Sequence, residues 1–159
     1  MSRLRALGLN IGTLLDVGAS TGCWTKKALP YFPGARFLCV EAQAAHEPAL
    51  QQFTRRYPRG GYVIAAAGAR EGEIHFDISA PFGGVASEQA GGLGWERVPV
   101  TTLDRLAAQH ELQSPFLIKL DTHGFEVPIL DGARAVLERT AVLIVEVYNF
   151  RISPDTLMF

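Results

Sequence analysis

The sequence predicts an α/β domain in which a mostly parallel sheet carries helices on both faces. Short apolar runs alternate with segments of helical length along the whole chain. The apolar runs are continuous rather than alternating, which is typical of parallel strands that helices bury on both sides. A chain of 159 residues can bury a substantial core as one domain, and we expect residues 1–159 to form a single domain without internal repeats.

The first half of the chain predicts alternating strands and helices. Leu50, Phe53 and Tyr57 recur three to four residues apart, as on one face of a helix. Two breakers, Pro33-Gly34 and Pro58-Arg59-Gly60, end the two predicted helices. The expected elements are strands at 13–17, 36–41 and 62–66 and helices at 21–32 and 45–57.

The second half begins less regularly. An alternating apolar pattern indicates an edge or hairpin strand at 73–79. Residues 81–96 are rich in Gly, Ala and Ser and predict a long loop. This loop either closes over a bound molecule or connects two strands, with Trp95 stacking on a ligand in the first case and anchoring the loop in the second. The remaining expected elements are strands at 97–101, 116–120 and 141–147 and helices at 102–109 and 125–139.

Composition excludes several classes of function. The chain is 48% hydrophobic and 19% charged with a formal net charge of −1, so no strong field attracts nucleic acid or anionic lipid. We expect no membrane span and no signal peptide. Cys23 and Cys39 are far apart and form no Cys-x-x-Cys motif, so we expect both to be buried thiols of a cytoplasmic protein.

A glycine turn follows the first predicted strand. Gly18 and Gly22 allow a sharp bend and a close approach of a ligand to the backbone. The helix after the turn directs free N–H groups and a partial positive charge toward it. The turn is therefore suited to hold a small molecule.

Four acids lie near the ends of core strands: Asp16, Glu41, Asp121 and Glu146. Ligands of open α/β sheets bind beyond the carboxyl ends of the strands. Any one of these acids alone is more easily explained as a loop or cap residue. Four of them beside a glycine turn indicate a site.

Glu41 suggests which ligand the site takes. A carboxylate at the end of the second strand can accept both hydroxyl hydrogens of a ribose, in nicotinamide dinucleotides or in S-adenosylmethionine. Ala19 stands where a dinucleotide turn has its second glycine, and Asp16 would repel a pyrophosphate. Both favour S-adenosylmethionine, whose methionine end carries an ammonium group, over a dinucleotide of an oxidoreductase.

Four blocks of the sequence resemble the FkbM-type S-adenosylmethionine-dependent methyltransferases. They are LDVGASTGCWT at 15–25, VEA at 40–42, AGAREGEI at 67–74 and IKLDTHGFE with LDGA at 118–133. The resemblance implies a Rossmann-like class I methyltransferase fold. It also implies transfer of a methyl group to a hydroxyl of a sugar, glycolipid or polyketide-like small molecule.

The resemblance also assigns roles to individual residues. The implied cofactor-binding residues are Asp16, Gly18, Ala19, Ser20, Gly22, Glu41, Ala42, Ala66 and Ala67. The implied residues around the departing methyl group are Lys119, Asp121 and His123. His123 departs from the Gln or Glu that is more usual in the family.

The chain ends at Phe159, so the last two strands of such a sheet are not expected in it. A short member of the family, a truncated product and a fragment all fit this length. The apolar strand at 141–147 then becomes a sheet edge through which two copies of the chain could pair. A catalytically inactive assembly module is the alternative function.

The chemical roles at 119–123 stay open at this point. Asp121 is either the general base or a helix cap or pocket wall, and His123 is the second candidate for the base. Lys119 needs a charge partner, either Asp121 or Glu146. Asp121, His123 and Glu146 could ligate a divalent cation, but nothing in their spacing requires it, and we expect no metal. We expect His46, His75 and His110 at the surface and assign them no role.

Overall fold

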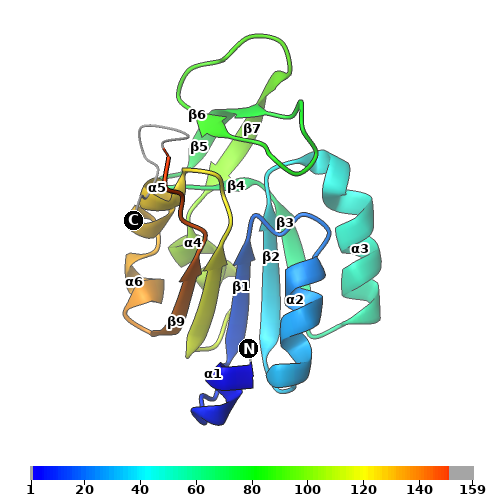
Figure 1. The fold of residues 1–159 in the computed structure, drawn as a ribbon, viewed down its shortest axis with the longest axis vertical. Coiled ribbons are helices and arrows are strands. Elements are labelled where there is room, and N and C mark those ends of the chain that lie inside the picture. The colour runs from blue at the N-terminus through cyan, green and yellow to red at the C-terminus, as the bar shows by residue number, and fades with distance from the viewer. Residues whose placement is uncertain (1, 151–159) are drawn as a thin grey trace.

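Five parallel strands form the central sheet of the computed structural model, which describes residues 2–150 (Figure 1). The strands are β1 (Thr13–Val17), β2 (Arg36–Glu41), β3 (Gly60–Ile64), β8 (Phe116–Leu120) and β9 (Thr140–Val145). Their order in space is β3-β2-β1-β8-β9. The chain leaves β1 toward β2 and later returns on the other side of β1, so the order reverses between β1 and β8. Ligands of α/β sheets bind at such a reversal.

Helices cover both faces of this sheet, as the sequence predicts. Leu14 and Leu117 pack on the face covered by α2 (Cys23–Ala28) and α3 (Glu47–Arg56). Their neighbours Leu15 and Ile118 point the other way, because side chains alternate along a strand. That second face carries α4 (Leu103–Gln109), α5 (Glu126–Asp131) and α6 (Arg134–Leu137).

A second, smaller sheet lies at the carboxyl end of the central one (Figure 1). It has the order β4-β7-β5-β6, from β4 (Ala66–Ala67), β5 (Gly72–Asp77), β6 (Ala86–Ser87) and β7 (Trp95–Thr101). The single strand expected at 62–66 is therefore wrong. The Ala65 N–H still bonds the Glu41 carbonyl, whereas Ala66 and Ala67 already pair with β7.

Two expected helices are also interrupted. The helix expected at 125–139 is divided into α5 and α6 at Gly132, where a Cβ atom would lie 2.0 Å from the Gly68 carbonyl oxygen. The helix expected at 21–32 is α2 followed by the 3-10 helix η1 (Leu29–Tyr31), which contains Pro30. A further 3-10 helix, η2 (Ala44–His46), precedes α3, and α1 (Ser2–Ala6) precedes β1.

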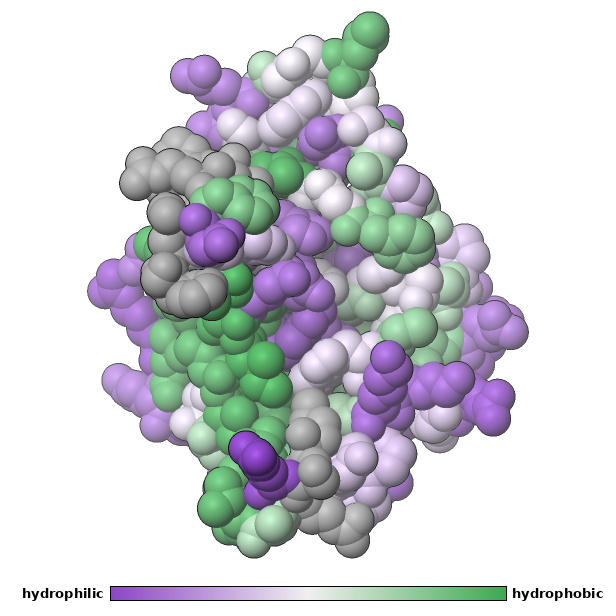
Figure 2. Space-filling model, viewed as in Figure 1, coloured by the Kyte–Doolittle hydropathy of each residue, from purple (hydrophilic) through white to green (hydrophobic). Residues whose placement is uncertain are grey.

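β9 is the last strand in the order of the central sheet, as expected for an edge. Leu143 is 41% exposed on it, and Figure 2 shows a hydrophobic surface over this part of the molecule. The expectation that both cysteines are buried is half wrong, because Cys23 is exposed and only Cys39 is buried. Among residues 2–150, none of the helices combines the length and hydrophobicity that crossing a membrane requires.

Candidate functional site

A cavity of about 200 Å³ opens at the carboxyl ends of β1, β2 and β8, under the second sheet. This is the edge at which the sequence places the ligand. The expected site residues that line the cavity are Gly18, Ser20, Glu41, Ala42, Ala66, Ala67, Asp121 and His123. The other four, Asp16, Ala19, Gly22 and Lys119, do not line the cavity.

The turn after β1 is held tightly between the neighbouring strand ends. The N–H groups of Gly18 and Ala19 both donate to the Val40 carbonyl, at 3.0 and 3.1 Å. Gly18 has φ +71°, and a Cβ atom there would lie 2.0 Å from the Asp121 carbonyl oxygen. Only glycine fits this combination of conformation and contact. The turn therefore brings the ends of β1, β2 and β8 together around one opening.

Glu41 is the carboxylate that the fold fixes most firmly in this cavity. The residue is 6% exposed. Each carboxylate oxygen accepts one backbone N–H group: Oε2 accepts from Ser20 at 2.7 Å, and Oε1 accepts from Gln43 at 2.8 Å. A carboxylate oxygen has a second lone pair for a further donor. Glu41 is thus oriented by the backbone and can still accept two hydroxyl hydrogens of a ligand.

Asp16 and Lys119 form an ion pair inside the sheet rather than in the cavity. Their strands pair them in register, and Lys119 Nζ lies 3.0 Å from Asp16 Oδ1. Burial raises the pKa of Asp16, against the opposing effect of the Lys119 charge. The Thr25 hydroxyl also donates to Asp16 Oδ2 at 2.7 Å, which ties α2 to β1. The pair holds the site together from behind.

Lys119 links this interior pair to the cavity. Its Nζ donates to the Gly18 carbonyl at 2.8 Å and lies 3.3 Å from Asp121 Oδ2. The expected pairing of Lys119 with Asp121 is confirmed, but its principal partner is Asp16, which the sequence pattern did not indicate. Ala19 packs in the core under α2, and Gly22, at φ +76°, faces the ring of Phe53.

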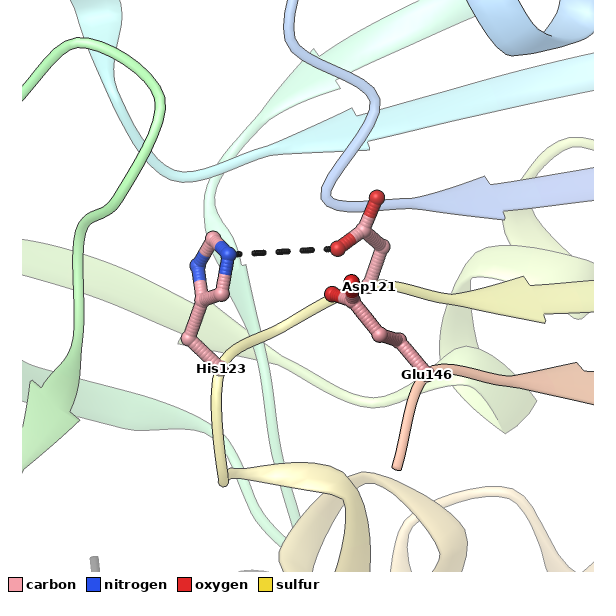
Figure 3. A group of neighbouring side chains, drawn as sticks. All are labelled: Asp121, His123 and Glu146. Atoms are coloured by element: carbon pink, nitrogen blue, oxygen red, sulfur yellow. Dashed lines mark ion pairs between the residues drawn. The ribbon is translucent and has the colours of Figure 1, made fainter. Parts of the chain in front are cut away.

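Asp121, His123 and Glu146 approach one another at the ends of β8 and β9 (Figure 3). The nearest atoms of the first two are Asp121 Oδ1 and His123 Nε2, 3.9 Å apart. Partial burial raises the pKa of Asp121, but the hydrogen bond with Glu146 and the charge of Lys119 outweigh it, so the pKa lies below its usual value. The same hydrogen bond raises the pKa of Glu146. Asp121 is therefore the more readily ionised member of the pair.

Asp121 does not cap the helix that follows it. The N-cap is Phe125, and the first helical residue is Glu126, whose Oε1 accepts from the Gly124 N–H at 3.1 Å and from the Thr122 hydroxyl at 3.0 Å. Glu126 thereby fixes the loop in which His123 takes φ +51°. Asp121 is left half-exposed and facing the cavity.

Sequence reasoning missed the part of the cavity wall that lies beyond β2. His46, expected at the surface, is 7% exposed, and its Nε2 lies 2.6 Å from the Pro81 carbonyl oxygen. The Gln43 amide donates to the Ala80 carbonyl at 3.1 Å. Together they hold the segment at 80–82 over the cavity. The sequence offered one indication of this role, because Gln43 and His46 follow Glu41 within five residues.

The glycine-rich loop before β7 holds Trp95 as an anchor. A Cβ atom on Gly91 would lie 2.5 Å from the indole, so the loop packs directly on the ring. Trp95 lines a separate groove between the second sheet and α5. Trp95 therefore does not line the cavity of Glu41, and the structure favours its role as a loop anchor over stacking on a ligand there.

The family model described as "Methyltransferase FkbM domain" matches residues 16–158. The chain belongs to the FkbM methyltransferase family. The match covers the glycine turn, Glu41 and the 118–133 block, on which the resemblance in sequence depends. No curated protein matches the sequence significantly.

This FkbM domain shares its fold with a solved structure. It is similar to a crystal structure of the methyltransferase FkbM from Methylobacillus flagellatus KT, with a TM-score of 0.63 and 22% identity over 87% of this chain and 33% of that chain. The chain therefore spans about a third of the length of that protein. A precorrin-6y C5,15-methyltransferase from Geobacter metallireducens GS-15 gives a TM-score of 0.45 and 14% identity, over 90% of this chain and 61% of that chain.

Proposed function

We propose that this FkbM domain binds S-adenosylmethionine and transfers its methyl group to a hydroxyl of a sugar, glycolipid or polyketide-like small molecule. The observation that carries the proposal is the orientation of Glu41. Two backbone N–H groups direct its carboxylate into the cavity beside the Gly18 turn. A vicinal diol, as in ribose, matches two carboxylate oxygens that each keep a lone pair.

The rest of the cavity fits the remainder of such a cofactor. Ala65, Ala66 and Ala67 line one wall, and their small side chains leave space for a flat ring. Asp121 also lines the cavity and contributes negative charge, which suits a cationic sulfonium group. When bound, S-adenosylmethionine supplies an already activated methyl group, so the protein's main task is to position the acceptor.

Asp121 and His123 are the proposed acceptors of the hydroxyl proton. An aliphatic hydroxyl is a weak nucleophile until a base within hydrogen-bond reach withdraws its proton, and such a base contributes about 10²–10⁴-fold. Asp121 is ionised more readily than an ordinary aspartate because Lys119 and Glu146 stabilise its charge. Lys119 acts through Asp121 and is a positioning residue.

The acceptor is proposed to be a small molecule, and the protein is proposed to be cytoplasmic. Cys23 and Cys39 are both free, which supports a reducing compartment. Pairing of two chains through β9 stays a prediction.

Isothermal titration with the demethylated product, S-adenosylhomocysteine, tests the proposal. We expect Glu41→Gln to weaken binding about 30-fold, because a charge-assisted hydrogen bond contributes about 2 kcal/mol. Glu138→Gln, at an exposed position that does not line the cavity, is the matched control and should leave the affinity unchanged.

The outcomes separate the candidate functions. Equal affinities of wild type and Glu41→Gln would remove Glu41 from the site. Tighter binding of NAD than of the demethylated product would indicate the oxidoreductase alternative. Cofactor binding without methyl transfer to any hydroxyl acceptor would indicate the inactive assembly module.

A further inference from the structure

The side chains of Asp121, His123 and Glu146 converge from two strand ends that are far apart in sequence. Each of them offers one ligand atom, and the three atoms lie within 4.8 Å of one another (Figure 3). Sequence spacing does not indicate this, because Glu146 reaches the group only through the pairing of β8 with β9. We propose that these three side chains bind a divalent metal cation with one nitrogen and two carboxylate ligands.

The imidazole of His123 is arranged as a metal ligand. Its Nδ1 lies 3.3 Å from the carbonyl oxygen of Gly84, a residue of the second sheet's loop and not of the group itself. Because a carbonyl only accepts, the neutral imidazole in this position has its proton on Nδ1 and the lone pair on Nε2. That Nε2 faces Asp121 Oδ1 at 3.9 Å, too far for a hydrogen bond. Metal-binding histidines typically donate their other N–H to such a carbonyl.

The charges around Asp121, His123 and Glu146 favour binding of a divalent cation. Lys119 lies nearest to Asp121 Oδ2 among the group's atoms, but it also neutralises Asp16, which is fully buried. One ammonium therefore faces three carboxylates: Asp16, Asp121 and Glu146. A divalent cation at the group would replace the proton of the Asp121–Glu146 hydrogen bond and offset the negative charge of both carboxylates.

The two oxygens of Asp121 divide these tasks. Oδ2 faces Lys119, whereas Oδ1 faces His123. Glu146 is exposed, with Oε2 accepting from the Tyr148 hydroxyl, so an ion can reach the group from solvent. Mixed imidazole and carboxylate ligands suit Mn²⁺, Fe²⁺ or Zn²⁺ better than they suit Ca²⁺, which prefers sites made of oxygen ligands alone.

The position of the group gives the ion a role in the proposed reaction, and this part of the inference depends on the proposed function. Asp121 and His123 line the same cavity as Glu41. A cation held there with open coordination positions would bind the acceptor's hydroxyl oxygen and lower the pKa of its proton, which Asp121 Oδ2, the oxygen that faces Lys119, would then accept in place of His123.

Titration of the full chain with Mn²⁺, followed by the loss of the free-ion electron paramagnetic resonance signal, tests the site without cofactor or turnover. We expect one tight site per chain. His123→Ala and Glu146→Gln should each weaken it about tenfold or more, and the exposed control Glu138→Gln should not. Cooperative urea unfolding of each variant shows that it is folded.

Two results would overturn the proposal: no Mn²⁺ bound by folded wild type, or affinity unchanged in both His123→Ala and Glu146→Gln. Either would leave the Asp121–Glu146 contact as a shared proton. Because S-adenosylhomocysteine binding is measured separately, a failure of the metal site is distinguishable from a failure of the cofactor site.

Discussion

The inside of the central sheet and its carboxyl rim use the same kind of residue for different purposes. Asp16 and Glu41 end neighbouring strands, and the sequence treats them alike. Asp16 is level with Cys39 in the register of β1 and β2, so Glu41 stands two residues further along the same face of the sheet. Two residues correspond to about 6.6 Å along a strand. This distance separates a fully buried ion pair from a carboxylate that opens onto the cavity.

The difference shows what each acid can do. Asp16 has its Lys119 and Thr25 partners within the core and does not line the cavity. Glu41 and Asp121 are held by neighbours from behind and face open space in front. The position of an acid along its strand therefore decides its role. An acid inside the paired part of the sheet contributes to stability, and an acid at the end of the pairing faces the cavity and can bind a ligand.

The interior pair gives the largest expected effect. Lys119→Met should lower the free energy of unfolding by about 3–5 kcal/mol, because it leaves Asp16 buried without a counter-charge. Urea denaturation measures this, with the exposed Lys26→Met as the control. The double variant Asp16→Asn/Lys119→Met should lose less than Lys119→Met alone. Equal losses would mean that the pair is not coupled.

The loss of stability in Lys119→Met should also depend on pH. The pKa of Asp16 in the folded protein is raised above 3.8, so the folded state holds this proton more tightly than the unfolded state. The resulting stability is present at low pH and is lost as the pH rises through the folded pKa. The deficit of Lys119→Met should therefore shrink as the pH falls toward 3.8, and a deficit independent of pH would argue against a buried Asp16 charge.

The rim turn gives the next effect. Gly18→Ala combines φ +71° with a Cβ atom 2.0 Å from a backbone oxygen, so it should cost at least about 2 kcal/mol of stability. Gly34→Ala is the matched control, because nothing lies within 4 Å of its Cβ position. Thermal unfolding that shifts equally for both variants would contradict the geometry of the turn.

The two thiols give the smallest effect and need no change in stability. Burial raises the pKa of Cys39 far above its usual value, with Asp16 adding to it, whereas Cys23 is exposed. Alkylation of the folded protein should modify Cys23 alone, and alkylation of the unfolded protein should modify both. Peptide mass spectrometry identifies the sites, and rapid labelling of Cys39 in folded Cys23→Ser would contradict this.

The central sheet was predictable because its strands are continuous apolar runs. The predicted strands at 13–17, 36–41 and 116–120 coincide with β1, β2 and β8. The second sheet was not predictable from the sequence, since β4 has two residues and pairs with a strand more than 30 positions away. The break at Gly132 likewise depends on a contact with Gly68, which no local pattern contains.

The site was predictable only in part, for the same reason. Glycines and strand-end acids gave Gly18, Glu41 and Asp121, which do line the cavity. The level of each acid in the sheet depends on strand register, and so the interior role of Asp16 did not follow from its position in the chain. The approach of Glu146 to Asp121 depends on the register of β9 in the same way.

Hydrogen exchange with and without S-adenosylhomocysteine tests most directly whether the cavity at the rim is the cofactor site. Binding should slow exchange of the backbone amides at 18–20 and 41–43, which surround the Glu41 carboxylate, and leave the amides at 72–74, which line the neighbouring groove, unchanged. Protection confined to the groove, or none at saturating ligand, would contradict it.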